Sequence, residues 1–411
     1  MYVAIIGGGL AGLLAAIRLQ YADCRVALID QPLPAAAGQL GGFAKFSGAK
    51  FSLPPAGMGL VQITENRASL DASINDVLAI LNLPPHSLQE YKQTENSIAE
   101  EFGFRFRGYR SYVLSPKEVS ALVQRLSDQL SIAEKIIGHV VNLEQTGNHW
   151  RISVQPAHAP NRHLIVDRVV YAGGRLGSEI IERTGAIEQT GKGIDIGVRV
   201  EFEDKSALSS LRELGPDAKV LMDRCRTFCL NYPGNVYRYE FRGILIPGGV
   251  VAHAETQSAN VGLLVRMPNK SDVLKRILTN FERLQSTYPR LCLSSVGSRG
   301  VIDDGILSTI FPEDAIDALN TFVEHLGRSR LIDWNTPYTV HFPLIDWHWS
   351  TYALPGSLRT SINGLYVAGD ISGHARGLLQ AAVSGWLCAE ACIKLVIRLT
   401  AISILCIGES H

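Results

Sequence analysis

The opening of the chain has the hydrophobic pattern of a β-α-β unit. Residues 2–6 form a short apolar run, residues 10–20 have apolar positions at helical spacing, and residues 25–30 form a second apolar run. Two strands joined through one helix in so short a stretch are typically parallel, because the crossover helix returns the second strand in the same direction. We therefore expect a parallel sheet to begin at the start of the chain.

Strand and helix patterns continue along the rest of the chain. Residues 35–60, rich in Gly, Ala, Ser and Pro, read as a long loop, and loops of that length in compact domains are usually functional. Hydrophobic periodicity predicts strands at 135–144, 150–155, 163–171, 194–202, 236–241, 261–266 and 365–369. It predicts helices within 67–105, at 116–129, 272–287 and 313–327, and from about Leu378. The middle of the chain therefore reads as mixed α+β.

A glycine motif directly follows the first predicted strand. Gly7, Gly9 and Gly12 satisfy the pattern G-x-G-x-x-G. Gly7 permits the tight turn, Gly9 lets the backbone approach a pyrophosphate, and Gly12 lets helix and strand pack closely. The N–H groups at the start of the helix, at Leu10 and Ala11, then face the phosphate charge. A glycine-rich turn without a ligand is the alternative, since the motif alone is weak evidence.

An acidic residue strengthens the dinucleotide interpretation. Asp30 ends the second predicted strand, 21 residues after Gly9, and is followed by Gln31. At this place a carboxylate can accept hydrogen bonds from ribose hydroxyls, and it disfavours the 2′-phosphate of NADP. The first motif therefore predicts FAD or NAD without choosing between them.

A second motif lies near the end of the chain. An apolar strand pattern ends in Gly369-Asp370, and a helix is expected to begin near Gly377 and Leu378. This resembles the C-terminal FAD signature of the glutathione-reductase-like flavoprotein superfamily. The resemblance implies that Asp370 contacts the ribitol or pyrophosphate region. It also implies that the helix start, with Gln380, faces the flavin N1/O2 edge, where the helix dipole stabilises negative charge. A buried strand ended by a capping aspartate is the alternative.

Two weaker matches support the same superfamily. Residues 170–175, Val-Tyr-Ala-Gly-Gly-Arg, resemble the strand end where such flavoproteins return beneath the cofactor, which would place Ala172 and Gly173 there. Val140 or Val141, on the strand predicted at 135–144, would make the backbone contact to adenine that is common in the superfamily; we select Val141. A plain strand-to-turn junction explains either segment as well.

The two motifs together predict the fold class and the domain division. We expect an α/β protein with a Rossmann-like FAD-binding domain (βαβ, GR2-type) and an inserted α+β substrate domain. The 411 residues exceed one ordinary domain. The FAD-binding domain is predicted to be discontinuous, formed by residues 1–50, 110–190 and 340–400. The substrate or cap domain is predicted at 51–109 and 191–339.

The middle of the chain suggests a subgroup and a reaction. Residues 226–234, Arg-Thr-Phe-Cys-Leu-Asn-Tyr-Pro-Gly, look like a segment of the uncharacterised FAD-dependent dehydrogenase group. Where that group often has Cys-x-Cys, this chain has Cys229 and Asn231, which puts a dithiol role in doubt. No second G-x-G-x-x-G follows a strand, so no separate NAD(P)H domain is expected. The resemblance implies a dehydrogenase or reductase that passes hydride between flavin N5 and a small organic substrate. A separate electron donor is a further option.

Four residues are candidates for catalysis, each with a plain alternative. Lys50, in the long loop, can stabilise reduced flavin or be a solvated lysine. Cys229 can attack a substrate if the neighbouring arginines Arg224 or Arg226 lower its pKa, or be an inert buried thiol. Tyr232 can be a general acid or a core tyrosine, and His374 can relay protons or bind a phosphate. The competing functions are a flavin monooxygenase or oxidase and a non-catalytic flavin-binding protein.

Composition narrows the partners. Lys+Arg and Asp+Glu both number 39, so no charge excess points to nucleic acid. The seven cysteines form neither CxxC pairs nor zinc-type clusters, so we expect no metal and a reducing cytoplasm. Lys394 and Arg398 interrupt the apolar run 391–407, so we expect no integral membrane segment. The oligomeric state stays open.

Overall fold

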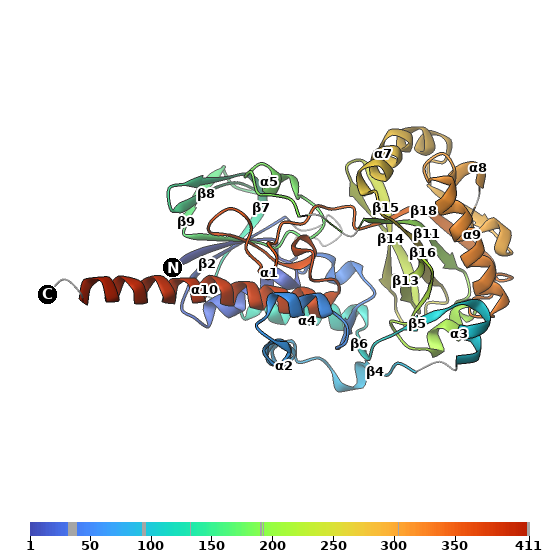
Figure 1. Cartoon of the computed structure of the whole chain (residues 1–411), viewed down its shortest axis with the longest axis horizontal. Helices are drawn as coiled ribbons and strands as arrows, with labels where there is room; N and C mark the ends of the chain where they lie inside the picture. Colours follow the sequence, from blue (N-terminus) through green and yellow to red (C-terminus); the bar gives the residue numbers. More distant parts are fainter. Residues whose placement is uncertain are drawn as a thin grey trace.

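The protein consists of two seven-stranded sheets with a cavity between them. The computed structural model describes residues 1–31, 39–92, 96–131, 133–189, 191, 193–302 and 304–408. The first sheet and the N-terminus lie on one side of Figure 1, and the second sheet with its helices lies on the other. Residues 32–38, part of the predicted loop 35–60, lie outside the described residues. Among the helices described, none has both the length and the apolar character needed to cross a membrane.

The first sheet contains the predicted β-α-β unit. β1 (Tyr2–Ile6) pairs in parallel with β2 (Arg25–Asp30), and α1 (Leu10–Gln20) connects them. The strand order is β19, β10, β1, β2, β7, β8, β9. The strands from β19 to β7 are parallel, and β7 to β9 are antiparallel. The other strands are β7 (Glu134–Thr146), β8 (His149–Pro156), β9 (Arg162–Val166), β10 (Arg168–Tyr171) and β19 (Leu365–Val367).

Helices from distant parts of the chain pack together on the first sheet. α1 is apolar nearly all round, which is typical of a helix buried on every side. It packs against α10 (Leu378–Gly408), and both share a core with α2 (Arg67–Leu81) and α4 (Pro116–Asp128). α2 belongs to the range 51–109, which the sequence assigned to the substrate domain, yet it packs in this core. The domain division stays a prediction.

The second sheet is antiparallel, with its large helices on one face. Its order is β17, β18, β11, β16, β13, β12, β5, and Figure 1 shows α7 and α9 covering the outer side. The bounds are β5 (Arg105–Arg107), β11 (Ile194–Phe202), β12 (Lys219–Met222), β13 (Cys225–Asn231), β16 (Ala259–Met267), β17 (Cys292–Ser295), β18 (Tyr338–Asp346), α7 (Lys270–Thr287) and α9 (Glu313–Arg328).

Smaller elements complete the molecule. β14 (Gly234–Phe241) and β15 (Ile244–Val251) form a hairpin, and β3 (Lys50–Ser52), β6 (Ser111–Val113) and β4 (Leu88–Gln89) form a small sheet. The remaining helices described are α3 (Asn96–Phe102), α5 (Glu179–Glu182), α6 (Ser209–Glu213) and α8 (Asp304–Leu307). The predicted α/β class with a Rossmann-like domain and a mixed second part is confirmed.

Strand β11 carries charged side chains on the face of the second sheet that is turned toward the cavity. Ile194, Ile196 and Val198 belong to the core that the sheet shares with α7 and α9. Because side chains alternate between the faces of a strand, Asp195 and Arg199 lie together on the opposite face. Both are buried. A strand that is buried on both faces thus brings charged groups to the inner wall.

Candidate functional site

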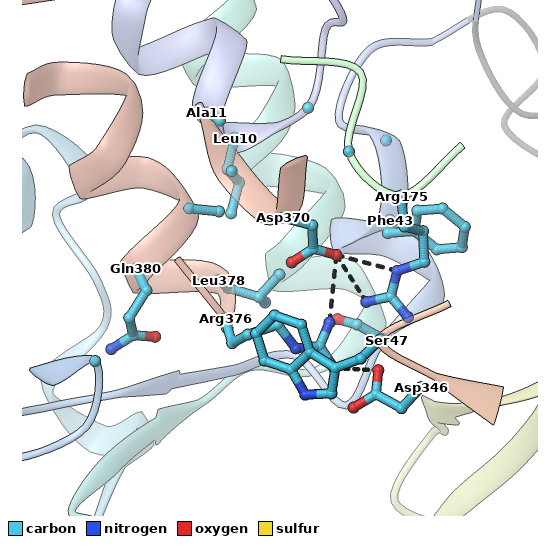
Figure 2. Close-up of a pocket in the computed structure, with 18 of the residues that line it drawn as sticks. Leu10, Ala11, Phe43, Ser47, Arg175, Asp346, Asp370, Arg376, Leu378 and Gln380 are labelled. Atoms are coloured by element: carbon cyan, nitrogen blue, oxygen red, sulfur yellow. Dashed lines mark hydrogen bonds and ion pairs between the residues drawn. The ribbon is translucent and has the colours of Figure 1, made fainter. Parts of the chain in front are cut away.

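The main cavity lies between the two sheets. It has a volume of about 1640 Å³ and is lined by the glycine turn after β1, the ends of β2 and β10, the start of α10 and the inner face of the second sheet. Figure 2 shows Leu10, Ala11, Leu378 and Asp370 around it on the side of the first sheet. The carboxyl ends of parallel strands are the usual ligand site of such sheets. Both sequence motifs therefore meet in one cavity.

Glycine is present at the three motif positions for different structural reasons. Gly7 has φ +110°, and a Cβ there would lie 2.4 Å from the carbonyl oxygen of Ala172. A Cβ on Gly12 would lie 1.8 Å from the carbonyl oxygen of Gly7. Gly9 lines the cavity, and a Cβ there would meet nothing within 4 Å. Packing thus requires Gly7 and Gly12, whereas Gly9 leaves open space on the cavity side.

The start of α1 can hold an anion in that space. The first bond of the helix runs from the amide of Leu13 to the carbonyl of Gly9, at 2.9 Å. The amides of Leu10, Ala11 and Gly12 precede this bond and therefore have no carbonyl of the helix as acceptor. With the positive end of the helix dipole they form a phosphate-binding end.

Asp30 has one carboxylate oxygen available to a ligand. It is 9% exposed, and its Oδ1 accepts a hydrogen bond from the amide of Gly8 at 2.8 Å. Its Oδ2 is buried and has no hydrogen-bond partner among the described residues. Burial raises the pKa of this carboxyl. A buried oxygen without a partner is costly, and a ribose hydroxyl would supply the missing donor. The neighbouring Gln31 also lines the cavity, and its side chain contacts His139 Nδ1 at 2.6 Å.

Asp30→Ala is expected to weaken FAD binding. Hydrogen bonds to a charged group contribute about 1.5–3 kcal/mol, which corresponds to roughly a 10- to 150-fold rise in Kd. Fluorescence titration of the apoprotein with FAD measures this change. Glu144→Ala, which removes an exposed carboxylate of β7 outside the cavity lining, is the control. Equal affinities for the Asp30→Ala variant and the parent protein would contradict the role of this carboxylate.

The residue selected for the contact to adenine, Val141, is the sequence neighbour of a residue that lines the cavity. Val140 lines the cavity together with Gly138 and His139, whereas Val141 is not among the lining residues. The pairing of β7 with β8 shifts between Val140 and Asn142, so the bulge falls at this point. Periodicity alone does not reveal where such a bulge lies, so the pattern gave no basis for selecting Val141 over Val140.

The second motif lies beside the first. Asp370 Oδ2 accepts hydrogen bonds from Arg175 Nε at 3.0 Å and from Arg376 at 3.3 Å, as Figure 2 shows. In the first turn of α10 the amide of Ala381 donates to the carbonyl of Gly377 at 2.9 Å, so the helix start again presents amides to the cavity. Gln380 is buried and donates to the carbonyl of Ser52 at 2.9 Å. Ala172, Gly173, Gly369, Gly377 and Leu378 also line the cavity.

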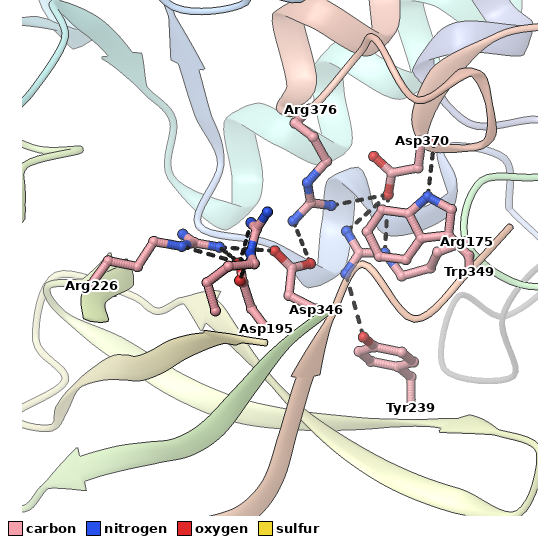
Figure 3. A network of polar contacts seen from close by, with 9 residues as sticks. Arg175, Asp195, Arg226, Tyr239, Asp346, Trp349, Asp370 and Arg376 are labelled. Atoms are coloured by element: carbon pink, nitrogen blue, oxygen red, sulfur yellow. Dashed lines mark hydrogen bonds and ion pairs between the residues drawn. The ribbon is translucent and has the colours of Figure 1, made fainter. Parts of the chain in front are cut away.

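A network of arginines and aspartates joins the two sides of the cavity. Arg376 contacts Asp346 at 2.7 Å, and Arg226 contacts Asp346 at 3.1 Å and Asp195 at 2.7 Å. Arg266 also pairs with Asp195. Figure 3 shows the chain of contacts from Asp370 to Asp195. Of these residues the sequence had singled out only Asp370 as a site residue. For Asp195 and Asp346 the signal was a charge within the largely apolar segments 194–202 and 338–346.

A family model matches just under half of the chain, including the first motif. Residues 2–201 match the family model described as FAD dependent oxidoreductase. The protein is an FAD-dependent oxidoreductase. The matched segment holds the glycine motif, Asp30 and the Ala172-Gly173 turn. The non-catalytic alternative is therefore disfavoured. The placement in the glutathione-reductase-like superfamily, and nearest to the uncharacterised dehydrogenase group, stays a prediction.

Solved structures with similar chains are distant. A flavoprotein/dehydrogenase from Cytophaga hutchinsonii is 12% identical, over 96% of this chain and 78% of that one, with a TM-score of 0.46. A p-nitrophenol 4-monooxygenase from Pseudomonas putida DLL-E4 is 14% identical, over 96% and 80%, with a TM-score of 0.42. No curated protein sequence matches the oxidoreductase. The assignment rests on the family match, because likenesses at these TM-scores add no argument.

The residues of the oxidoreductase fit FAD. The open space before Gly9, the amides at the start of α1 and the unpartnered oxygen of Asp30 lie in one cavity with Asp370. They present donors to a pyrophosphate and an acceptor to a ribose, which are the groups that a dinucleotide needs.

The four catalytic candidates do not all reach the cavity. Lys50, Cys229 and His374 line it. Tyr232 is not among the lining residues; its hydroxyl lies 3.2 Å from that of Ser209, and its ring packs against the second core. The sequence expected Arg224 or Arg226 to act on Cys229, and this was wrong. Arg224 pairs with Asp314, and Arg226 pairs with Asp195 and Asp346, because both point along other parts of the sheet.

The network makes the stability of the oxidoreductase pH-dependent. Burial would raise the pKa of Asp346, but Arg376, Arg226 and Arg175 lower it to about 2 from an ordinary value of 3.8. A depressed pKa stabilises the fold above the unfolded value, and the contribution is lost as pH falls through the folded value. We expect a loss of stability between about pH 4 and about pH 2 that the Asp346→Asn variant lacks. Urea unfolding at several pH values measures it, and parallel curves for both proteins would contradict it.

Proposed function

We propose that the oxidoreductase passes a hydride between N5 of FAD and a small organic substrate, without a nicotinamide domain of its own. The carrying observation is the size and lining of the cavity. Its volume of about 1640 Å³ exceeds the roughly 300–1,000 Å³ of an ordinary small-molecule site. The dinucleotide motifs occupy only the side of the first sheet, so the second sheet leaves room for a substrate opposite them.

The cofactor residues of this proposal come from both ends of the chain. When bound, FAD supplies the redox chemistry. The residues expected to bind it are Gly7, Gly9, Leu10, Ala11, Gly12, Asp30, Gln31, a valine at 140 or 141, Ala172, Gly173, Gly369, Asp370, Gly377, Leu378 and Gln380. The start of α10 would stabilise negative charge on the ring. We also propose that the first sheet is the FAD-binding unit and the second the substrate unit.

The strands of the second sheet that line the cavity would position the substrate and limit the access of water. Phe106, Leu221 and Phe228 line the cavity from β5, β12 and β13, and they offer apolar surface. His374 lies between Asp370 and the start of α10, where a histidine can hold or move a proton. Lys50 lies on β3 at the same cavity and can hold a positive charge there. These roles for His374 and Lys50 are part of the proposal.

The test is a visible spectrum followed by an anaerobic titration. We expect flavin bands, slow reduction by NADH or NADPH, and fast reduction by an organic substrate of the enzyme in a panel of small alcohols, amines and hydroxy acids. Rapid bleaching by NADPH would contradict the absence of a nicotinamide site. Oxygen consumption that is coupled to hydroxylation or to stoichiometric peroxide would instead indicate a monooxygenase or an oxidase.

A further inference from the structure

Cys229 has an unusual backbone conformation at the cavity. Its φ is +47°, in the left-handed region that residues other than glycine rarely adopt. The pairing of β13 with β16 is interrupted here, between Phe228 and Asn231. The residue lines the cavity at this interruption. Such backbone outliers occur preferentially at functional sites.

A buried arginine lies beside this cysteine without an acidic partner. Arg199 is 1% exposed, on the inner face of β11. It donates to the carbonyls of Pro247 at 3.3 Å and Cys229 at 3.2 Å and to the Asn260 side chain at 2.7 Å, all of them neutral acceptors. No ion pair of Arg199 is found among the described residues. Buried guanidinium groups are normally paired with an anion, because an uncompensated buried charge is strongly unfavourable.

A second cation approaches the same cysteine from another element. Lys50, on β3, donates through Nζ to the carbonyl of Leu230, the residue after Cys229. The acids near this cluster are Asp217, which already contacts Lys219 at 3.3 Å and Ser52 Oγ at 3.0 Å, and Glu201, which contacts His341 at 3.0 Å. Lys219 and Arg212 add positive charge around Lys50, so the cations of the cluster outnumber these carboxylates.

We propose that Cys229 is a thiolate at neutral pH and is the nucleophilic group of the cavity, held in that state by Arg199 and Lys50. The anion gives the buried arginine a counter-charge. The Asn231 side-chain nitrogen also lies 3.7 Å from Sγ, although its shorter contacts are to the Cys229 carbonyl at 2.8 Å and to Asn260 Oδ1 at 3.0 Å. This assignment goes beyond hydride transfer and does not depend on it.

The charges around the thiol also favour its ionised form. Burial raises the pKa of Cys229, but Arg199, Lys50 and the Asn231 hydrogen bond together lower it below its ordinary value, and Asp217 opposes them. Burial lowers the pKa of Lys50, while Asp217 and Cys229 raise it. The charged groups that face the thiol thus come from β3, β11 and the segment before β12.

Alkylation of the FAD-loaded protein by iodoacetamide tests the assignment. The reagent forms a bond to Sγ and releases iodide, and peptide mass spectrometry gives the rate at each cysteine over a range of pH. We expect the pH midpoint at Cys229 to lie below about 8.5, the value of an ordinary cysteine. Cys225, whose pKa burial raises to about 12, is the internal control and is expected to stay unlabelled near neutral pH.

Variants of the cations separate this role from a structural one. Lys50→Met is expected to slow labelling of Cys229 about tenfold near neutral pH, as a shift of one pKa unit would. Lys50→Arg should restore the rate, and Lys50→Met keeps the test available if Arg199→Met does not fold. A midpoint at or above 8.5, no labelling at neutral pH, or no effect of Lys50→Met would overturn the assignment. Normal labelling with a failed substrate titration would overturn only the proposed reaction.

Discussion

Gly9→Val is expected to give a folded protein that contains no FAD. Gly9 has φ −71° and ψ −179°, an extended conformation that valine also adopts. A Cβ at this position meets no atom within 4 Å, and Gly9 lines the cavity, so a side chain here begins in open space. The space that the side chain fills is the space in front of the α1 amides, where the pyrophosphate is expected. We therefore expect loss of cofactor at little cost in stability of the apoprotein.

The flavin absorbance of the purified variant and its urea unfolding curve measure the two effects separately. Gly12→Ala is the contrasting variant, because its Cβ would lie 1.8 Å from the carbonyl oxygen of Gly7 and α1 would have to move. It is expected to destabilise the fold itself. Cys229→Ser should keep the yellow colour. A Gly9→Val protein that still binds FAD would place the pyrophosphate elsewhere.

Asp346→Ala is expected to lower the free energy of unfolding by about 3–5 kcal/mol. Asp346 is 1% exposed and pairs with Arg226 and Arg376. Removing the carboxylate leaves two guanidinium groups in a buried site without this partner, and breaking a buried pair in this way costs about that much.

Asp314→Ala is the matched control. Its carboxylate also contacts an arginine, Arg224 at 2.7 Å, but the Asp314 side chain is 58% exposed. Exposed ion pairs contribute about 0–1 kcal/mol, because water and salt screen them. Urea unfolding of both variants at neutral pH provides the comparison. Equal losses for the two would show that the buried network contributes no more than a surface pair.

The elements of the fold were predictable where one pattern dominated. The parallel unit around residues 2–30 and the strand at 194–202 follow from periodicity, because burial on one or both faces fixes the residue types. The packing of α2 on the first core was not predictable, because an amphipathic helix does not specify which apolar surface it covers. The same holds for the exact position of the bulge near Val140.

The first cofactor motif could be recognised from the sequence because its residues lie close together along the chain. Gly7, Gly9 and Asp30 are positioned by one β-α-β unit, so spacing alone relates them. The arginine network was not readable, because its partners come from distant strands: Arg226 and Asp346 are 120 positions apart. Cys229 shows the same limit. Its sequence neighbours Arg224 and Arg226 point elsewhere, and the cations that act on it come from β3 and β11.

The order of strands in the first sheet has a consequence for biosynthesis. β1 is made long before β19, yet both flank β10 in the finished sheet. At about 5–20 residues per second, roughly 20–70 s separate their emergence from the ribosome. Through that interval the nascent chain carries an unfinished sheet with an open apolar edge. The coenzyme site is then completed late in synthesis, because Gly369 and Asp370 follow β19 in the chain.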